Sequence, residues 1–241
     1  MSSLKKYTGV VLGLLFTFSV QAQNLGIETY HLNSKSNNLQ GKMLGEVFTL
    51  NADINYFFLY PDDWVPGSVK FVNGNVFENI RLRYQAFDDE LITYNDNGGF
   101  LYVVEKEMVK WFSFQDGSKT RKFVRLTKNN NQQTSMYLEE LYNRELSLLV
   151  NWYIYEQSVS PYTDRNGIKR AVEYLMRKDY YLYTEKDGLT KIRLNRAALF
   201  SLFPENKKQI RKLLRKNRLH INSELSMIDA LGLLSKNKLT E

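Results

Sequence analysis

The chain has 241 residues, contains no cysteine and carries a formal net charge of +7 at pH 7. Without cysteine it forms no disulfide framework, no thiolate metal site, no cysteine nucleophile and no lipid-modified N-terminal cysteine. The hydrophobic core alone must therefore hold the fold together, and the length suffices for one large domain.

The first 22 residues have the layout of a secretory signal peptide. Lys5 and Lys6 form a short positive region, residues 10–20 are almost unbrokenly apolar, and Val20-Gln21-Ala22 supplies a cleavage site. The apolar run is shorter than the roughly 20 residues that a membrane span requires. We therefore expect export, cleavage after Ala22, and a mature chain without a transmembrane span in the periplasm or at the outer membrane.

Two regions with different patterns follow the leader. Residues 23–45 are rich in Asn, Ser, Gly and Gln, and predict an irregular lead-in. Residues 46–194 contain short runs in which apolar and polar residues alternate, most clearly in NIRLRYQAF (residues 79–87) and LSLLVNWYIYEQ (residues 146–157). This alternation predicts strands with one buried and one exposed face.

Turn dipeptides separate these runs. Asn73-Gly74, Asp116-Gly117 and Asp187-Gly188 tolerate the positive φ angles of tight hairpin turns. About ten short strands then succeed one another without long helices between them, which is incompatible with a parallel βαβ fold. The sequence predicts a mainly β protein: an antiparallel meander that forms a rolled sheet, an open barrel or a sandwich.

Residues 195–241 predict a basic C-terminal segment of about three short helices, after a boundary near Leu194. Asn195 suits the N-cap of the first helix, and Pro204 suits the first turn of the second. In the third helix, apolar residues spaced by three predict a buried stripe. They are Leu225, Ile228, Leu231 and Leu234.

The second predicted helix concentrates the charge of the chain. KKQIRKLLRKNR, residues 207–218, contains seven cations and no acid: Lys207, Lys208, Arg211, Lys212, Arg215, Lys216 and Arg218. Two interpretations remain open: a solvated face of a structural helix, or a surface that binds lipid headgroups, lipopolysaccharide phosphates or an acidic envelope protein. Nucleic acid is not expected as a partner, because the chain is predicted to be exported and has no nucleic-acid-binding motif.

Tyrosines form a second candidate binding surface. Tyr153 and Tyr155 share one predicted strand face, and Tyr181 and Tyr183 share another. A row of tyrosines on a sheet can bind a sugar chain or a peptide through flat, amphipathic contacts. The alternative is that these rings complete the packing of the sheet.

Acidic clusters provide the only candidate catalytic groups. They are Asp62, Asp63, Asp88, Asp89 and Glu90. Two carboxylates on a β scaffold can hydrolyse a glycosidic bond, but Asp is also common in turns, where both clusters are predicted to lie. The two histidines, His31 and His220, have no partner at zinc-ligand spacing.

The sequence contains no Gly-x-Ser-x-Gly elbow and no phosphate-binding loop. We therefore expect no cofactor and no metal. The favoured interpretation is a non-enzymatic binding or accessory component of a periplasmic or outer-membrane assembly. The alternative is a hydrolase of envelope polysaccharide or peptidoglycan that uses the paired carboxylates.

Two stretches resemble exported cell-envelope proteins of Bacteroidetes-type Gram-negative bacteria. The first, FVNGNVFENIRLRYQAFDDELI, carries the resemblance at Asn73-Gly74, Phe77, Tyr84, Asp88-Asp89 and Leu91-Ile92. The second is the tail LFPENKKQIRKLLRKNRLHINSEL, which is similar to helical ends of the same proteins. The resemblance implies an envelope setting and transfers no catalytic residue, because these proteins have no assigned activity.

Export and processing can be measured directly. We expect intact-mass analysis of the protein from envelope fractions to give a chain that begins at Gln23, because Ala22 ends the predicted cleavage site. Recovery of the full-length chain from the cytoplasm would contradict the predicted export and would reopen nucleic acid as a partner.

Overall fold

The structure is a computed structural model that describes residues 28–31, 42–47, 59–95, 100–127, 135–165 and 167–239. The predicted signal peptide lies outside the described residues. Within them, twelve strands form one antiparallel sheet in the order β1-β2-β6-β5-β4-β3-β7-β8-β9-β10-β11-β12. The two end strands, β1 and β12, do not pair with each other, so the sheet stays open. The predicted mainly β, antiparallel fold is confirmed.

The first six strands are β1 (Glu28–His31), β2 (Lys42–Val47), β3 (Leu59–Phe71), β4 (Val76–Gln85), β5 (Glu90–Asn95) and β6 (Phe100–Val104). A 3-10 turn, η2 (Lys106–Met108), follows them. The next six are β7 (Val109–Asp116), β8 (Lys119–Thr127), β9 (Ser135–Asn143), β10 (Ser147–Thr163), β11 (Lys169–Thr184) and β12 (Gly188–Ile192). The helices are α1 (Arg196–Leu202), α2 (Lys207–Lys216) and α3 (Glu224–Lys236).

The predicted hairpin turns are confirmed. Gly74, Gly117 and Gly188 have φ angles of 93°, 59° and 68°, which suit glycine at tight turns. A further turn joins β10 to β11, where the Asp164 carboxylate accepts a hydrogen bond from the Ile168 amide at 2.9 Å. Local turn chemistry therefore accounts for the hairpins β3–β4, β7–β8, β10–β11 and β11–β12, whereas the pairs β2–β6 and β3–β7 join strands that are not consecutive.

An aromatic core fills the inner face of the sheet. Its centre consists of Phe112 stacked on Phe123 at 4.8 Å between ring centroids, with Tyr84 4.9 Å from Phe123. Tyr60 of β3 also stacks on Trp152 of β10 at 5.4 Å. Because β7, β8 and β9 lie between these two strands in the sheet order, the sheet must roll to bring them together.

Strict alternation fails where both faces of a strand are covered. Arg83 and Gln85 were predicted on the exposed face of β4, yet they are 8% and 0% exposed. The Arg83 guanidinium lies over the Trp64 ring at 5.5 Å, so an aromatic side chain covers this second face. Leu149 of β10 is likewise buried, beside Leu148 and Val150.

Two stretches predicted as irregular or turn structure are extended instead. β1 and β2 pair antiparallel within the predicted lead-in. The predicted turn YPDDWVPG (residues 60–67) lies inside β3, where the register with β4 shifts between Tyr60 and Val65. A bulge of this kind allows a strand to continue through residues that favour turns.

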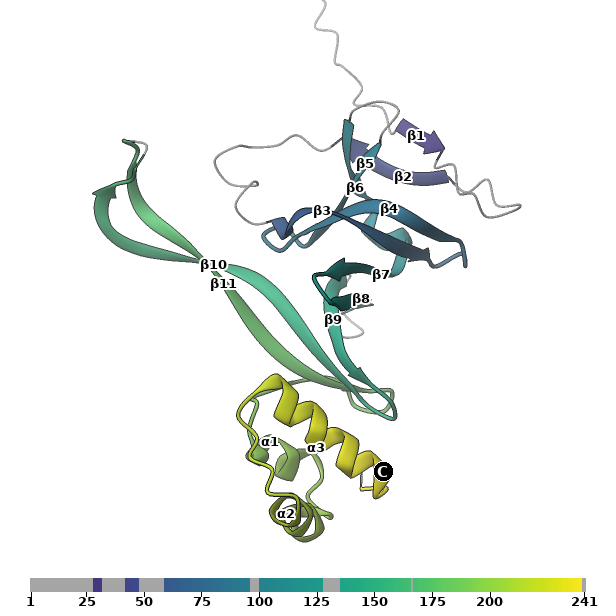
Figure 1. The fold of residues 1–241 in the computed structure, drawn as a ribbon, viewed down its shortest axis with the longest axis vertical. Helices are drawn as coiled ribbons and strands as arrows, with labels where there is room; N and C mark the ends of the chain where they lie inside the picture. The colour runs from purple at the N-terminus through teal and green to yellow at the C-terminus, as the bar shows by residue number, and fades with distance from the viewer. Residues whose placement is uncertain are drawn as a thin grey trace, which may run out of the picture.

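β10 and β11 form a ribbon of 17 and 16 residues that extends away from the other strands (Figure 1). β9 pairs with β10 only over residues 147–150, and β12 pairs with β11 only over residues 180–184. The rest of the ribbon is therefore two strands wide among the described residues.

The three helices pack on the base of this ribbon, next to the β9–β10 turn (Figure 1). The Asn195 cap is confirmed: its side chain accepts a hydrogen bond from the Ala198 amide at 3.0 Å. α2 begins at Lys207, after Pro204 rather than with it. The helical core combines strand and helix residues: Leu146, Leu148, Leu182, Ile192, Leu199, Ile210, Leu214, Met227, Ala230, Leu231, Leu234 and Leu239.

The predicted stripe of α3 is wrong at its first residue, because Leu225 is 71% exposed. In an α-helix, each step of three residues falls about 60° short of a full turn. Three such steps separate Leu225 from Leu234, so the two side chains point to opposite sides of the helix. The buried side instead follows the spacing of Met227, Ala230, Leu231 and Leu234. None of the helices in the described part of the chain is long and apolar enough to cross a membrane.

Gly67 of β3 lies where the neighbouring strands leave no room for a side chain. A Cβ at this position would lie 2.4 Å from the Ser113 carbonyl oxygen and 2.6 Å from Leu82 Cδ1. We expect Gly67→Ala to lower the free energy of unfolding by about 1–3 kcal/mol, as overpacking does. Gly232→Ala is the control, because nothing lies within 4 Å of its Cβ position in α3. Urea denaturation should show this variant stabilised by about 0.5–1 kcal/mol. Equal effects of the two substitutions on the free energy of unfolding would contradict the close packing around Gly67.

Candidate functional site

The solvent-facing side of α2 and its C-terminal end form a basic face, defined as the seven cations of residues 207–218. All seven side chains are exposed: Lys207, Lys208, Arg211, Lys212, Arg215, Lys216 and Arg218. None of them forms an ion pair with any residue that the structure describes. The structure therefore places all of them together in water, as the sequence predicted for either interpretation of this helix.

The apolar side of α2 is used inside the protein. Ile210 is fully buried and Leu214 nearly so, both in the helical core, and Leu213 is half-buried. Lys207 Nζ and Arg211 Cζ lie 5.9 and 5.6 Å from the centre of the Phe200 ring of α1. The basic face therefore has no free apolar stripe to insert into a bilayer, and it can bind only by charge and hydrogen bonding.

The N-terminal end of α2 adds to the positive potential. Lys207 and Lys208 occupy its first turn, which contains no acidic residue. The macrodipole makes this end of a helix partly positive, so cations here are unfavourable by themselves and an anion is favourable. The local arrangement costs stability in the free protein, and a bound anion would relieve that cost.

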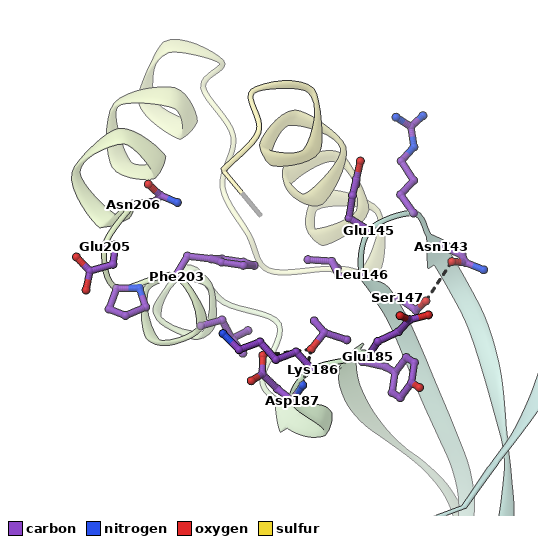
Figure 2. Close-up of a pocket in the computed structure, with 15 residues that line it drawn as sticks. Asn143, Glu145, Leu146, Ser147, Glu185, Lys186, Asp187, Phe203, Glu205 and Asn206 are labelled. Carbon is purple, nitrogen blue, oxygen red and sulfur yellow. Dashed lines mark hydrogen bonds between the residues drawn. The ribbon is translucent and has the colours of Figure 1, made fainter. Parts of the chain in front are cut away.

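A pocket of about 690 Å³ lies next to the start of α2 (Figure 2). Two hairpin turns, at residues 143–147 and 183–187, and the α1–α2 connection at residues 202–206 form its walls. Leu146 and Phe203 provide apolar surface. The charged lining residues are Arg144, Glu145, Glu185, Lys186, Asp187 and Glu205.

Several polar groups of this pocket form hydrogen bonds within its two hairpin turns. The Asp187 amide donates to Thr184 Oγ1 at 2.9 Å, and Ser147 Oγ lies 3.2 Å from Asn143 Oδ1. The sequence did not predict this pocket, because its walls come from three separate segments. Its four acids outnumber its two bases, so an acidic rim borders the basic face.

The four candidate tyrosines share one face of the ribbon. Leu149 pairs with Tyr181 and Ser147 with Tyr183, so the odd-numbered side chains of both strands point to the same side. Tyr155 is 49% exposed, whereas Tyr153, Tyr181 and Tyr183 are half-buried. The structure thus joins two predicted faces into one row, which we call the tyrosine face.

The candidate catalytic carboxylate Asp89 is a half-buried hydrogen-bond acceptor. It accepts from the Tyr84 hydroxyl at 2.8 Å, from Lys106 Nζ at 3.0 Å and from the Tyr137 amide at 3.1 Å. Burial raises the pKa of Asp89 above its usual value, although Lys106 opposes this. These bonds tie the β4–β5 turn to η2 and β9, which gives Asp89 a role in the fold.

The structure describes the side chains of four further candidates: Asp63, Asp88, Glu90 and His220. Asp88 is exposed in the β4–β5 turn, and Glu90 begins β5. Asp63 is exposed on β3 and accepts a hydrogen bond from the Trp64 amide at 2.7 Å. The side chains of Asp62 and His31 lie outside the described residues, and His220 is exposed. The described residues contain no group of three or more acidic, His or Cys side chains that could hold a metal ion.

Sequence reasoning missed a polar cluster on the inner face of the sheet. Arg121 of β8 forms ion pairs with Asp116 and Glu139, both at 2.7 Å, and its guanidinium lies 4.9 Å from the Tyr60 ring centre. Glu139 is 4% exposed and also accepts from Trp152 Nε1 at 2.6 Å. Each charge of this cluster therefore has a partner inside the protein.

The cluster continues to the helices. Lys178 Nζ lies 4.1 Å from the Trp152 ring centre and forms an ion pair with Glu224 of α3 at 2.8 Å. The Tyr180 hydroxyl donates to the same carboxylate at 2.8 Å, and burial raises the pKa of Tyr180. We call the whole set the polar clamp: Tyr60, Asp116, Arg121, Glu139, Trp152, Lys178, Tyr180 and Glu224.

A signal for the polar clamp exists in the sequence. Three charged residues of the clamp each lie two residues from a buried or half-buried aromatic residue of the same strand: Arg121, Glu139 and Lys178. Residues two apart on a strand point to the same face of the sheet, so these charges point inward with the aromatic rings. A charge on the buried phase of a strand is expected to have a partner. The alternation alone does not identify that partner, because the groups come from separate strands and a helix.

Comparison with models of protein families, with curated proteins and with solved structures found no match to this chain. We therefore infer the function from the geometry of the described residues.

Glu224 provides a test of the polar clamp. Burial raises its pKa, but hydrogen bonds from Lys178 and Tyr180 outweigh burial and hold the pKa below its usual value. The stabilisation is therefore present above the unfolded-state pKa, about 4.3, and is lost as pH falls through the folded-state pKa. We expect Glu224→Gln to cost about 1 kcal/mol at pH 7, because the pair is about one-third exposed.

The measurement is urea denaturation at pH 7 and at pH 3. The difference in the free energy of unfolding between wild type and Glu224→Gln should be smaller at pH 3 than at pH 7. Glu205→Gln is the matched control, since Glu205 is exposed and has no ion pair among the described residues. It should change stability by less than about 0.5 kcal/mol at either pH. A difference for Glu224→Gln that is independent of pH would contradict the ionic contribution.

Proposed function

We propose that this chain is an exported, non-enzymatic envelope protein that serves as a binding or accessory component, and that its basic face docks it on a phosphate-bearing lipid or lipopolysaccharide surface. The observation that carries the proposal is the set of seven exposed cations without an ion pair among the described residues. The predicted leader and the resemblance to envelope proteins support the location.

The density of the cations favours docking over a merely solvated helix. Exposed cations without an ion pair among the described residues also occur on the strands, for example Lys110, Lys119 and Lys169, but they lie on separate strands. On α2, by contrast, like charges gather in neighbouring turns, which is unfavourable by itself. Attraction to an anionic surface contributes on the order of 1 kcal/mol of binding free energy for each nearby Lys or Arg, and the negative charges of the surface would offset the repulsion among the cations.

The binding mode follows from the packing of the helix. Because Ile210 and Leu214 are buried in the helical core, α2 cannot turn its apolar side to the lipid without unfolding that core. Docking is therefore peripheral and electrostatic. Salt screens such attraction over roughly 8 Å at physiological ionic strength, so binding should weaken steeply as salt is added.

The test replaces the centre of the basic face with glutamine: Arg211→Gln, Lys212→Gln, Arg215→Gln and Lys216→Gln. Vesicles of phosphatidylglycerol, of phosphatidylcholine and of phosphatidylcholine with added lipopolysaccharide are sedimented with the mature protein across a salt series. We expect wild type to bind the two anionic vesicles at low salt, and the variant to bind at least about a hundredfold more weakly.

A matched control separates position from total charge. Lys110→Gln, Lys119→Gln, Lys169→Gln and Arg177→Gln remove four exposed cations elsewhere and should leave binding nearly unchanged. The melting temperatures of both variants should stay close to wild type, since exposed substitutions usually cost under about 0.5 kcal/mol each. If wild type fails to bind at low salt, or if both variants bind equally, the basic face is only a solvated helix surface.

A further inference from the structure

The outer edge of β10 is unpaired over most of its length. Beyond Val150, β10 pairs only with β11, so the backbone amides and carbonyls of its other edge have no strand partner among the described residues. Residues 155–158 are all exposed. An unpaired strand edge of this length is a template for another strand.

The two edges of the ribbon differ in charge. Among residues 151–163 of β10, Glu156 is the only charged residue. Among residues 169–179 of β11, six of eleven are charged: Lys169, Arg170, Glu173, Arg177, Lys178 and Asp179. Charged side chains protect an edge from pairing, so the β11 edge is protected in this way and the β10 edge is not.

We propose that the β10 edge pairs antiparallel with the β10 edge of a second copy of this chain, which forms a two-fold symmetric dimer. Symmetric antiparallel pairing places odd-numbered residues opposite odd-numbered residues, so the tyrosine faces of both copies lie on the same side. Tyr153 and Tyr155 of the two copies then make one continuous aromatic row. Cross-strand aromatic pairs stabilise such an interface.

Charge selects among the registers. An axis at Glu156 would set the two Glu156 carboxylates opposite each other, which is unfavourable. An axis at Tyr155 sets Tyr155 opposite Tyr155 of the second copy, Tyr153 opposite Gln157, and Glu156 opposite Ile154. In this register, no two like charges lie opposite each other. This register uses residues 152–158, all beyond the part of β10 that pairs with β9, and it ends where the bulge between Ser158 and Tyr162 begins.

Solution mass tests the dimer. We expect light scattering of the mature protein at physiological salt, without lipid, to give twice the mass of one chain at micromolar concentration. Tyr155→Lys should raise the dissociation constant at least about tenfold, because it sets two cations opposite each other at the axis. Met176→Lys on β11 is the matched control: it also replaces a partly exposed apolar residue and should leave the dimer intact.

Cysteine trapping then locates the interface, since the chain has no cysteine of its own. Opposite residues in an antiparallel pair are about 4.5–5.5 Å apart at Cα, within reach of a disulfide. We expect Tyr155→Cys to form a covalent dimer with diamide, and Ala171→Cys on β11 to stay monomeric in the same denaturing gel. A monomeric wild type, a dimer that survives Tyr155→Lys, or equal trapping at both positions would overturn the proposal. Circular dichroism of each variant shows whether loss of the dimer reflects unfolding.

Discussion

The contact between Tyr60 of β3 and Trp152 of β10 determines the shape of this protein. These strands are not neighbours in the sheet, and they meet because the sheet rolls around the aromatic core. Arg121 and Glu139 hold the contact from one side, and Lys178 holds it from the other through Glu224 of α3. The polar clamp therefore connects the roll of the sheet to the position of the helices. Removal of the Arg121 guanidinium would leave the buried Glu139 carboxylate without its cation, which is costly.

The polar clamp and the basic face place cations in different surroundings. Within the sheet, a cation such as Arg121 is paired because it points into the fold. On α2, the helical core uses the apolar side, and the remaining positions all point to water. The acidic rim of the neighbouring pocket gives this end of the molecule adjacent surfaces of opposite sign. On the proposed anionic surface, such separation would favour one orientation of the protein, with the acidic rim away from the surface.

The ribbon of β10 and β11 has a different physical origin. Its base is stabilised by β9, β12 and the helices, and its middle by the aromatic contacts of Trp152 and Tyr60. Farther out, the Phe87 ring of the β4–β5 turn lies 6.1 Å from the Tyr174 ring of β11. Beyond that contact, the ribbon is two strands wide among the described residues, which is marginal in water. A second copy on the β10 edge would supply the missing strands. The proposed dimer would also present two basic faces, and paired sites raise the apparent affinity for a surface.

The sequence by itself determined the local features: antiparallel strands, the glycine turns at Gly74, Gly117 and Gly188, the Asn195 cap and the exposed cations of α2. Each depends on neighbouring residues, for which spacing and turn chemistry suffice. Only the tertiary structure decided that Arg83 is buried, that Asp89 is an acceptor within the fold, and that Lys178 meets Glu224. These contacts join residues that are close only after the sheet rolls, and a period of two or of 3.6 residues contains no information about that closure.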